Sequence, residues 1–87
     1  MKIIAKEIEM ISVFKKDGKI EPIKFKISDN DGEEQLIRVS KITSVTETKM
    51  AGITSVIFLC ESVINEINKQ YELKYRIGEH RWELYKY

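Results

Sequence analysis

The spacing of turn-forming residues constrains the fold of this 87-residue chain more than any other feature of its sequence. Five short turn signals divide the chain into six segments whose apolar and polar residues alternate as in β-strands. These signals lie at residues 16–19, 29–33, 50–52, 65–68 and 77–80. Strands joined by such short turns run antiparallel. The sequence therefore predicts an all-β protein, a six-stranded antiparallel meander rolled into a small β-barrel, with residues 1–87 as one domain.

The first hairpin is predicted from Asp17-Gly18, a dipeptide that favours a two-residue type I′ loop. Counting outward from this loop places Met10 opposite Phe25 on one face of the hairpin. On the other face Glu9 falls opposite Lys26, which is a favourable cross-strand pair of opposite charges. Local turn chemistry and strand alternation therefore agree on one register.

The same register places Pro22 opposite Val13, at a pair that exchanges no hydrogen bonds. Because proline has no N–H to donate, the second strand is predicted to be an edge of the sheet near Pro22. A helical reading competes at residues 3–15, where apolar residues also recur with period 3.6, and a helical turn competes at 62–69. The hairpin is favoured over the first helix because one register explains both the turn residues and Pro22.

The last hairpin is predicted from Gly78-Glu79, with glycine first as a type II′ turn requires. This loop pairs Tyr75 with Trp82 and Leu73 with Leu84 on the face that we expect to form the core. The opposite, solvent face then pairs Lys74 with Glu83 and Glu72 with Tyr85.

The middle of the chain leaves two registers open. At 50–52, a three-residue loop with Gly52 in the left-handed conformation is preferred, but a two-residue Ala51-Gly52 loop pairs Val45 with Phe58 better. At 65–68, any even-length loop places Phe58 on the same face as Leu73. Residues 35–49 are too long for a straight strand in so small a domain, and their alternation breaks near Ser40-Lys41, where we expect a bulge or bend.

Candidate catalytic or metal-binding residues are few, and we expect neither enzymatic activity nor a cofactor. The acidic segment 29–34 does not place its ligands at the positions that a calcium loop requires, so it is predicted to be a solvated turn. His80 belongs to a turn, and Cys60 lies in an apolar run without a second cysteine nearby. The sequence contains no nucleophile elbow, phosphate-binding loop or zinc-protease motif.

Charge and cysteine content predict a cytoplasmic protein. A net charge of +1 gives no strong field toward nucleic acid or an anionic membrane. The single cysteine excludes an internal disulfide and is typical of a reducing compartment. The residues after Met1 become charged too early for a signal peptide, and no apolar run approaches the length of a membrane-spanning helix.

Ile11 and Val13 lie on the face of the first hairpin opposite the predicted core, so another surface must cover these apolar side chains to shield them from solvent. The curvature of the barrel, residues 1–7, or a partner surface would supply this cover. The edge near Pro22 would suit strand addition by a partner. The function predicted from these features is a non-catalytic interaction module that binds a protein partner or a second copy of itself.

The C-terminal part supports an alternative, a small β-barrel that binds nucleic acid. Basic and aromatic side chains alternate there in a way that lets bases stack between phosphate-binding cations. The candidate residues are Lys74, Arg76, Arg81, Tyr85 and Lys86. Acidic residues mixed among them, and the burial expected for Tyr75 and Trp82, weaken this alternative.

Several segments of the chain resemble a family of short bacterial all-β proteins of unknown function. The resemblance rests on EMISVF (9–14), DGKI (17–20), PIKFKI (22–27), YELKY (71–75) and WELYK (82–86), and it covers roughly residues 8–87. It implies a free-standing cytoplasmic bacterial protein. It assigns no catalytic or binding residue.

Overall fold

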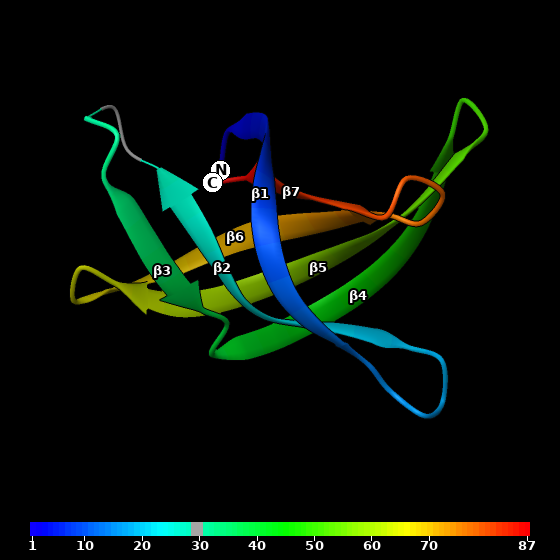
Figure 1. The fold of residues 1–87 in the computed structure, drawn as a ribbon, viewed down its shortest axis with the longest axis horizontal. Helices are drawn as coiled ribbons and strands as arrows, with labels where there is room; N and C mark the ends of the chain where they lie inside the picture. Colours follow the sequence, from blue (N-terminus) through cyan, green and yellow to red (C-terminus); the bar gives the residue numbers. More distant parts are fainter. Residues whose placement is uncertain (29–30) are drawn as a thin grey trace.

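A computed structural model describes residues 1–28 and 31–87, which form one strongly curled antiparallel sheet (Figure 1). Its strands are β1 (Ile3–Phe14), β2 (Ile20–Ser28), β3 (Glu34–Arg38), β4 (Lys41–Met50), β5 (Ile53–Ile64), β6 (Ile67–Arg76) and β7 (Arg81–Lys86). They are ordered β3-β2-β1-β7-β6-β5-β4 across the sheet. The all-β prediction is confirmed, and the helical alternatives at 3–15 and 62–69 are wrong.

The sheet has seven strands, so the prediction of six is wrong. The difference arises in residues 35–49, which form two strands because the chain turns between Arg38 and Lys41. At this turn the Val39 amide donates to the Ile23 carbonyl of β2 at 2.9 Å, and the Ser40 amide donates to the carbonyl of Glu61 in β5 at 3.1 Å. The chain thus passes from the side of β2 to the side of β5 where the sequence predicted a bend.

β1 is shared by two parts of the sheet. Its residues 9–14 pair with β2, whereas residues 3–8 pair with β7 on the other side. Figure 1 shows β1 curving along its length and crossing β5 and β6 in the view. In the strand order, β2 and β3 lie on one side of β1, and β7, β6, β5 and β4 lie on the other. The two parts fold over each other about β1 and enclose the core.

The barrel is half open, so the prediction of a closed barrel is wrong. β3 and β4 are the two edges of the sheet. β3 approaches β5, but no Cα atom of β2 lies within 8 Å of a Cα atom of β4. We call the space between residues 20–23 of β2 and the free edge of β4 the seam. It opens because β3, which pairs with β2 only from Lys24 onward, is too short to fill it.

The first hairpin has a three-residue loop, so the predicted two-residue loop is wrong. Lys15 and Lys19 bracket it through a backbone hydrogen bond of 2.8 Å, and Gly18 takes a left-handed φ of 86°. The predicted pairs of Met10 with Phe25 and of Glu9 with Lys26 are nevertheless confirmed. They survive because a bulge in β2 adds one residue, which cancels the extra residue of the loop.

This bulge changes the position of Pro22. Pro22 lies opposite Ser12 rather than Val13, and its side chain is fully buried on the inner face of the sheet. The prediction that β2 is an edge near Pro22 is confirmed, since β3 does not pair with that part of β2. The predicted pairing of Pro22 is wrong because strand alternation carries no sign of the extra residue, Ile23.

The two central hairpins have two-residue loops. At Ala51-Gly52 both residues are left-handed, with φ of 52° and 81°, which is the type I′ form. Val45 accordingly pairs with Phe58, so the two-residue alternative is confirmed and the preferred three-residue loop is wrong. At Asn65-Glu66, where the sequence left the register open, the loop has two residues and Phe58 pairs with Leu73.

The last hairpin keeps its predicted register through a different loop. Tyr75 pairs with Trp82 as predicted, but residues 77–80 form a four-residue loop in which His80 is left-handed at φ 54°. Further along, a bulge at Tyr85 places Lys86 opposite Glu72, so the predicted pairing of Glu72 with Tyr85 is wrong.

The core lies on the inner face of the curled sheet. Phe25 of β2 packs edge-on against Tyr71 of β6, with ring centroids 5.6 Å apart, and this contact joins the two parts of the sheet. Val45 shares the inner face with Phe58 but is 58% exposed, because β4 is an edge strand and no described strand pairs with its free side. The buried hydrophobic residues are Phe25, Ile37, Phe58, Cys60, Ile64, Tyr71, Leu73, Tyr75, Trp82 and Leu84.

Candidate interaction surface

The residues predicted for an interaction surface occupy three places. Ile11 and Val13 are exposed on the outer face of β1. Pro22 is buried on the inner face, so its side chain is not available to a partner. The remaining five lie on the outer face of β6 and β7. The structure therefore groups the basic and aromatic candidates, but it separates them from Pro22.

Carboxylates accompany the basic candidates of β6 and β7. Arg76 Nη2 lies 2.9 Å from Glu83 Oε2, and Arg81 Nη1 lies 3.1 Å from Glu7 Oε2. Ion pairing is looser for the third cation, since Lys86 Nζ lies 4.0 Å from Glu72 Oε1. Lys74 Nζ lies 4.5 Å from the centre of the Tyr85 ring. The positive charge of this face is thus largely balanced within the protein.

Glu83 is a buried charge on this outer face. It is only 6% exposed, and its Oε1 has no hydrogen-bond partner within the described residues, although Oε2 meets the Arg76 guanidinium. Arg76 Nε also lacks a partner there. The pair therefore holds β6 to β7 through one short contact and leaves one polar atom unsatisfied on each side.

β4 is the long free edge of the sheet. It has 10 residues, nine of which have a partner in β5, and on its other side no described strand pairs with it. A bulge at Thr43 interrupts the ladder near the start of β4, and Thr43 Oγ1 donates to the Leu59 carbonyl at 3.0 Å. From Ser44 to Met50 the ladder is regular. An unbroken edge of this kind presents free N–H and C=O groups to a further strand.

A groove of about 420 Å³ lies at the closed end of the seam. Its lining combines the start of β2, the turn between β3 and β4, and the start of β4. The lining residues are Glu21, Pro22, Ile23, Arg38, Val39, Ser40, Lys41 and Ile42. The groove leads directly onto the free edge of β4, because Lys41 and Ile42 belong to both.

Three cations gather where β2, β3 and β4 meet, and we call Lys24, Arg38 and Lys41 the basic corner. Lys24 lies directly opposite Arg38 in the pairing of β2 with β3, and Arg38 and Lys41 both line the groove. None of the three forms an ion pair within residues 1–28 and 31–87. Glu21, the one carboxylate of the groove, lies 3.6 Å from Lys15 instead.

The basic corner was not predicted from the sequence, although one sequence feature points to it. The broken alternation at Ser40-Lys41 predicted a bend, and basic residues stand on both sides of that bend. The pairing of Lys24 with Arg38 depends on the short strand β3, which the sequence did not separate from β4.

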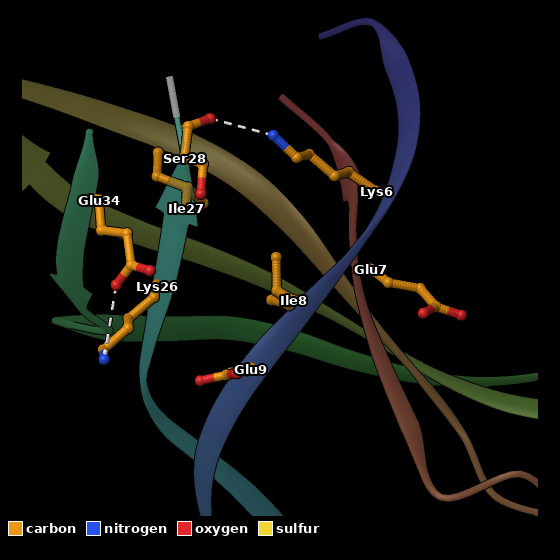
Figure 2. Close-up of a pocket in the computed structure, with 8 residues that line it drawn as sticks. All are labelled: Lys6, Glu7, Ile8, Glu9, Lys26, Ile27, Ser28 and Glu34. Atoms are coloured by element: carbon orange, nitrogen blue, oxygen red, sulfur yellow. Dashed lines mark hydrogen bonds and ion pairs between the residues drawn. The ribbon is translucent and has the colours of Figure 1, made fainter. Parts of the chain in front are cut away.

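A smaller pocket of about 150 Å³ lies where β1 separates from β2 (Figure 2). Its polar groups are joined to one another. Lys6 Nζ donates to the Ser28 carbonyl at 3.0 Å, and Lys26 lies 3.6 Å from Glu34. Glu7 points away from the other side chains in Figure 2 and pairs with Arg81. The contact of Lys6 with Ser28 ties β1 to β2 across the pocket, whereas the contact of Lys26 with Glu34 joins β2 to β3.

Cys60 and His80 do not meet at a site. Cys60 is fully buried, and burial raises the pKa of its thiol to about 12. His80 lies at the exposed last loop, where its Nδ1 is 3.1 Å from Tyr75 Oη. In the described part of the chain, no group of three or more metal-ligating side chains occurs. The predicted acidic turn at 29–34 includes Asp29 and Asn30, which lie outside the described residues.

Comparison with protein-family models, curated proteins and solved structures finds no match. The resemblance to a bacterial family therefore stays a prediction. None of the described residues forms a helix that could span a membrane.

Proposed function

We propose that this protein is a non-catalytic interaction module that binds an extended segment of a protein partner by strand addition along β4. The unpaired edge of β4 is the observation that carries this proposal. Main-chain hydrogen bonds to a free edge supply affinity in this mode of recognition, and side-chain contacts supply specificity.

The dimensions of the seam support the insertion of one strand. Neighbouring strands of a sheet lie about 4.8 Å apart, so two strands that flank a third are about 9.6 Å apart. No Cα atom of β2 lies within 8 Å of a Cα atom of β4, so the two strands are not paired and β4 keeps a free side for such a strand. The added strand would also cover the free side of a sheet that is otherwise left half open.

Val45 supplies an apolar contact for the added strand. Its side chain shares the inner face with Phe58 and is exposed only because the seam is open. Covering an aliphatic side chain of this size contributes about 1 kcal/mol. A partner segment with an apolar residue opposite Val45 would therefore be preferred over a wholly polar one.

A second copy of this chain would offer the same kind of edge, so self-association belongs to the same proposal. Nucleic-acid binding through Lys74, Arg76, Arg81, Tyr85 and Lys86 is the weaker candidate, because carboxylates and an aromatic ring already engage the cations there. The buried free thiol of Cys60 is consistent with the cytoplasmic location that we propose.

Peptide display tests strand addition directly. A library of random decapeptides is selected on the purified protein, and the enriched peptides are then measured by fluorescence anisotropy. We expect binding to slow hydrogen exchange of the β4 amides. We also expect Val45→Lys to weaken binding at least tenfold, because it places a charge in the seam. Val63→Lys is the matched control, since Val63 is 67% exposed but lies on β5, away from the seam.

Two outcomes contradict the proposal. One is a selection that enriches no peptide above background, and the other is a set of peptides that protect strands other than β4 and bind both lysine variants equally. Sedimentation over a range of protein concentrations separates the two kinds of partner: dimers that Val45→Lys dissociates identify a second copy, and a monomer at all concentrations favours a different protein.

A further inference from the structure

We propose that the segment which adds to β4 carries acidic side chains at the end that lies over the basic corner. This inference rests on the proposed function and specifies the partner's chemistry. Arg38, the last residue of β3, and Lys41, the first residue of β4, both line the groove, so a strand added along the start of β4 passes beside both cations.

Two of the three cations of the basic corner face a like charge in the free protein, whereas Lys41 stands opposite Glu61 of β5. Lys24 and Arg38 stand directly opposite each other on adjacent strands, where like charges repel. No carboxylate within the described residues lies in ion-pair distance of any of the three cations, in contrast to the outer face of β6 and β7. A ligand carboxylate would replace this repulsion with attraction. The corner therefore selects acidic side chains and disfavours basic ones.

The groove and the edge of β4 also fix the direction of the segment. β4 begins at the basic corner and runs away from it along the seam. Every pairing in the described sheet is antiparallel, and an antiparallel pair is slightly more stable per residue than a parallel one. A segment that adds antiparallel to β4 has its C-terminal end over the basic corner. Its acidic residues should thus follow its apolar residues.

Three synthetic decapeptides test this inference. Each alternates Thr and Val over eight residues and has blocked termini, so that only its added side chains differ in charge. One carries Glu-Glu at its C-terminal end, one carries Glu-Glu at its N-terminal end, and one carries Lys-Lys at its C-terminal end. We expect the first to bind at least fivefold more tightly than the third, which is the scale of two exposed charge pairs. We expect this preference to shrink as salt is added.

A second experiment reverses the charge of the basic corner on the protein itself. The double variant Arg38→Glu, Lys41→Glu should prefer the Lys-Lys peptide. It is expected to fold, because both side chains are exposed and the Lys24–Arg38 repulsion is removed, which offsets the new like-charge pair that Lys41→Glu forms with Glu61 of β5. The matched control is Lys2→Glu, Lys16→Glu, which makes the same change of net charge at two exposed lysines outside the groove. The control should keep the preference for the acidic peptide.

The outcomes separate this inference from the proposed function. If all three peptides bind equally and protect the β4 amides, strand addition holds and the acidic preference is wrong. If no peptide binds or protects β4, strand addition itself fails and the inference fails with it. A single-stranded oligonucleotide that binds more tightly than the acidic peptide, and loses affinity in the charge-reversed variant, would assign the corner to phosphate and overturn the inference.

Discussion

The hydroxyl groups of Ser62 and Tyr71 lie 2.5 Å apart in the buried core. Ser62 Oγ also donates a hydrogen bond of 2.7 Å to the backbone carbonyl of Arg38. Because the Ser62 hydroxyl has one hydrogen, which goes to that carbonyl, the Tyr71 hydroxyl donates to Ser62. This chain of two hydrogen bonds fixes the end of β3 against β5 and so positions the basic corner at the start of β4.

Ser62→Ala should destabilise the protein more than Tyr71→Phe. The serine variant leaves both the Tyr71 hydroxyl and the Arg38 carbonyl without their partner, at a cost of about 2 kcal/mol. The phenylalanine variant keeps the bond from Ser62 to Arg38 and should cost about 1 kcal/mol. Urea denaturation of both variants measures the difference. If Tyr71→Phe lowered the free energy of unfolding as much as Ser62→Ala, or more, the hydrogen bond from Ser62 to the Arg38 carbonyl would not be what holds β3 in place.

Arg76→Ala should lower the free energy of unfolding by about 2 kcal/mol, because it leaves the Glu83 carboxylate buried and unpaired. The loss is smaller than for a fully buried pair, since the Arg76 side chain is partly exposed. Arg81→Ala, which breaks the exposed pair with Glu7, should cost less than about 1 kcal/mol. The double variant Arg76→Met, Glu83→Leu should be more stable than Arg76→Ala alone, as measured by thermal unfolding.

Ala51→Gly should stabilise the hairpin between β4 and β5. Ala51 adopts a left-handed φ of 52°, which is unfavourable for a residue with a Cβ atom and free of that penalty for glycine. We expect the variant to gain about 0.5–1 kcal/mol, measured as a higher urea midpoint with an unchanged m-value. An unchanged or lower midpoint would mean that the flexibility of the introduced glycine in the unfolded chain offsets the relief of strain.

Stability should fall at alkaline pH. Burial raises the pKa of the Cys60 thiol from 9.0 to about 12 and that of the Tyr71 hydroxyl from 10.0 to about 12. Both groups ionise more readily in the unfolded chain, so their contribution is complete below about pH 9 and is lost between pH 9 and 12. Urea denaturation from about pH 8 to about pH 11 measures the slope. Cys60→Ala and Tyr71→Phe should each reduce it, and a slope that neither variant changes would contradict this assignment.

Turn-forming residues and strand alternation were enough to predict several of the cross-strand pairs in the sheet. Asp17-Gly18 led to the correct pairing of Met10 with Phe25, and Gly78-Glu79 led to that of Tyr75 with Trp82. Both loops were nevertheless assigned the wrong length. The first pairing survived because a bulge in β2 offset the added loop residue, and bulges leave little trace in a single sequence.

The free edge and the basic corner depend on contacts between remote residues. The closure of the barrel was wrongly predicted because it depends on whether β4 meets β2, which alternation within β4 cannot determine. Val45 has the pattern of a core residue, and its exposure follows only from the missing neighbour strand. Arg38 and Lys24 become neighbours through the pairing of β3 with β2, which the prediction of one long strand concealed.

The pairing of β1 with β7 has a consequence for how the chain reaches its native state. Ile8 pairs with Trp82, and beyond that ladder the backbones of Lys2 and Tyr87 exchange hydrogen bonds of 3.0 and 2.9 Å. Closing so long a loop is entropically costly, and folding slows as contacts become more remote along the chain. A circular permutant that joins residue 87 to residue 2 through a short turn-forming linker and opens the chain at the 77–80 loop would turn this remote pairing into a local hairpin.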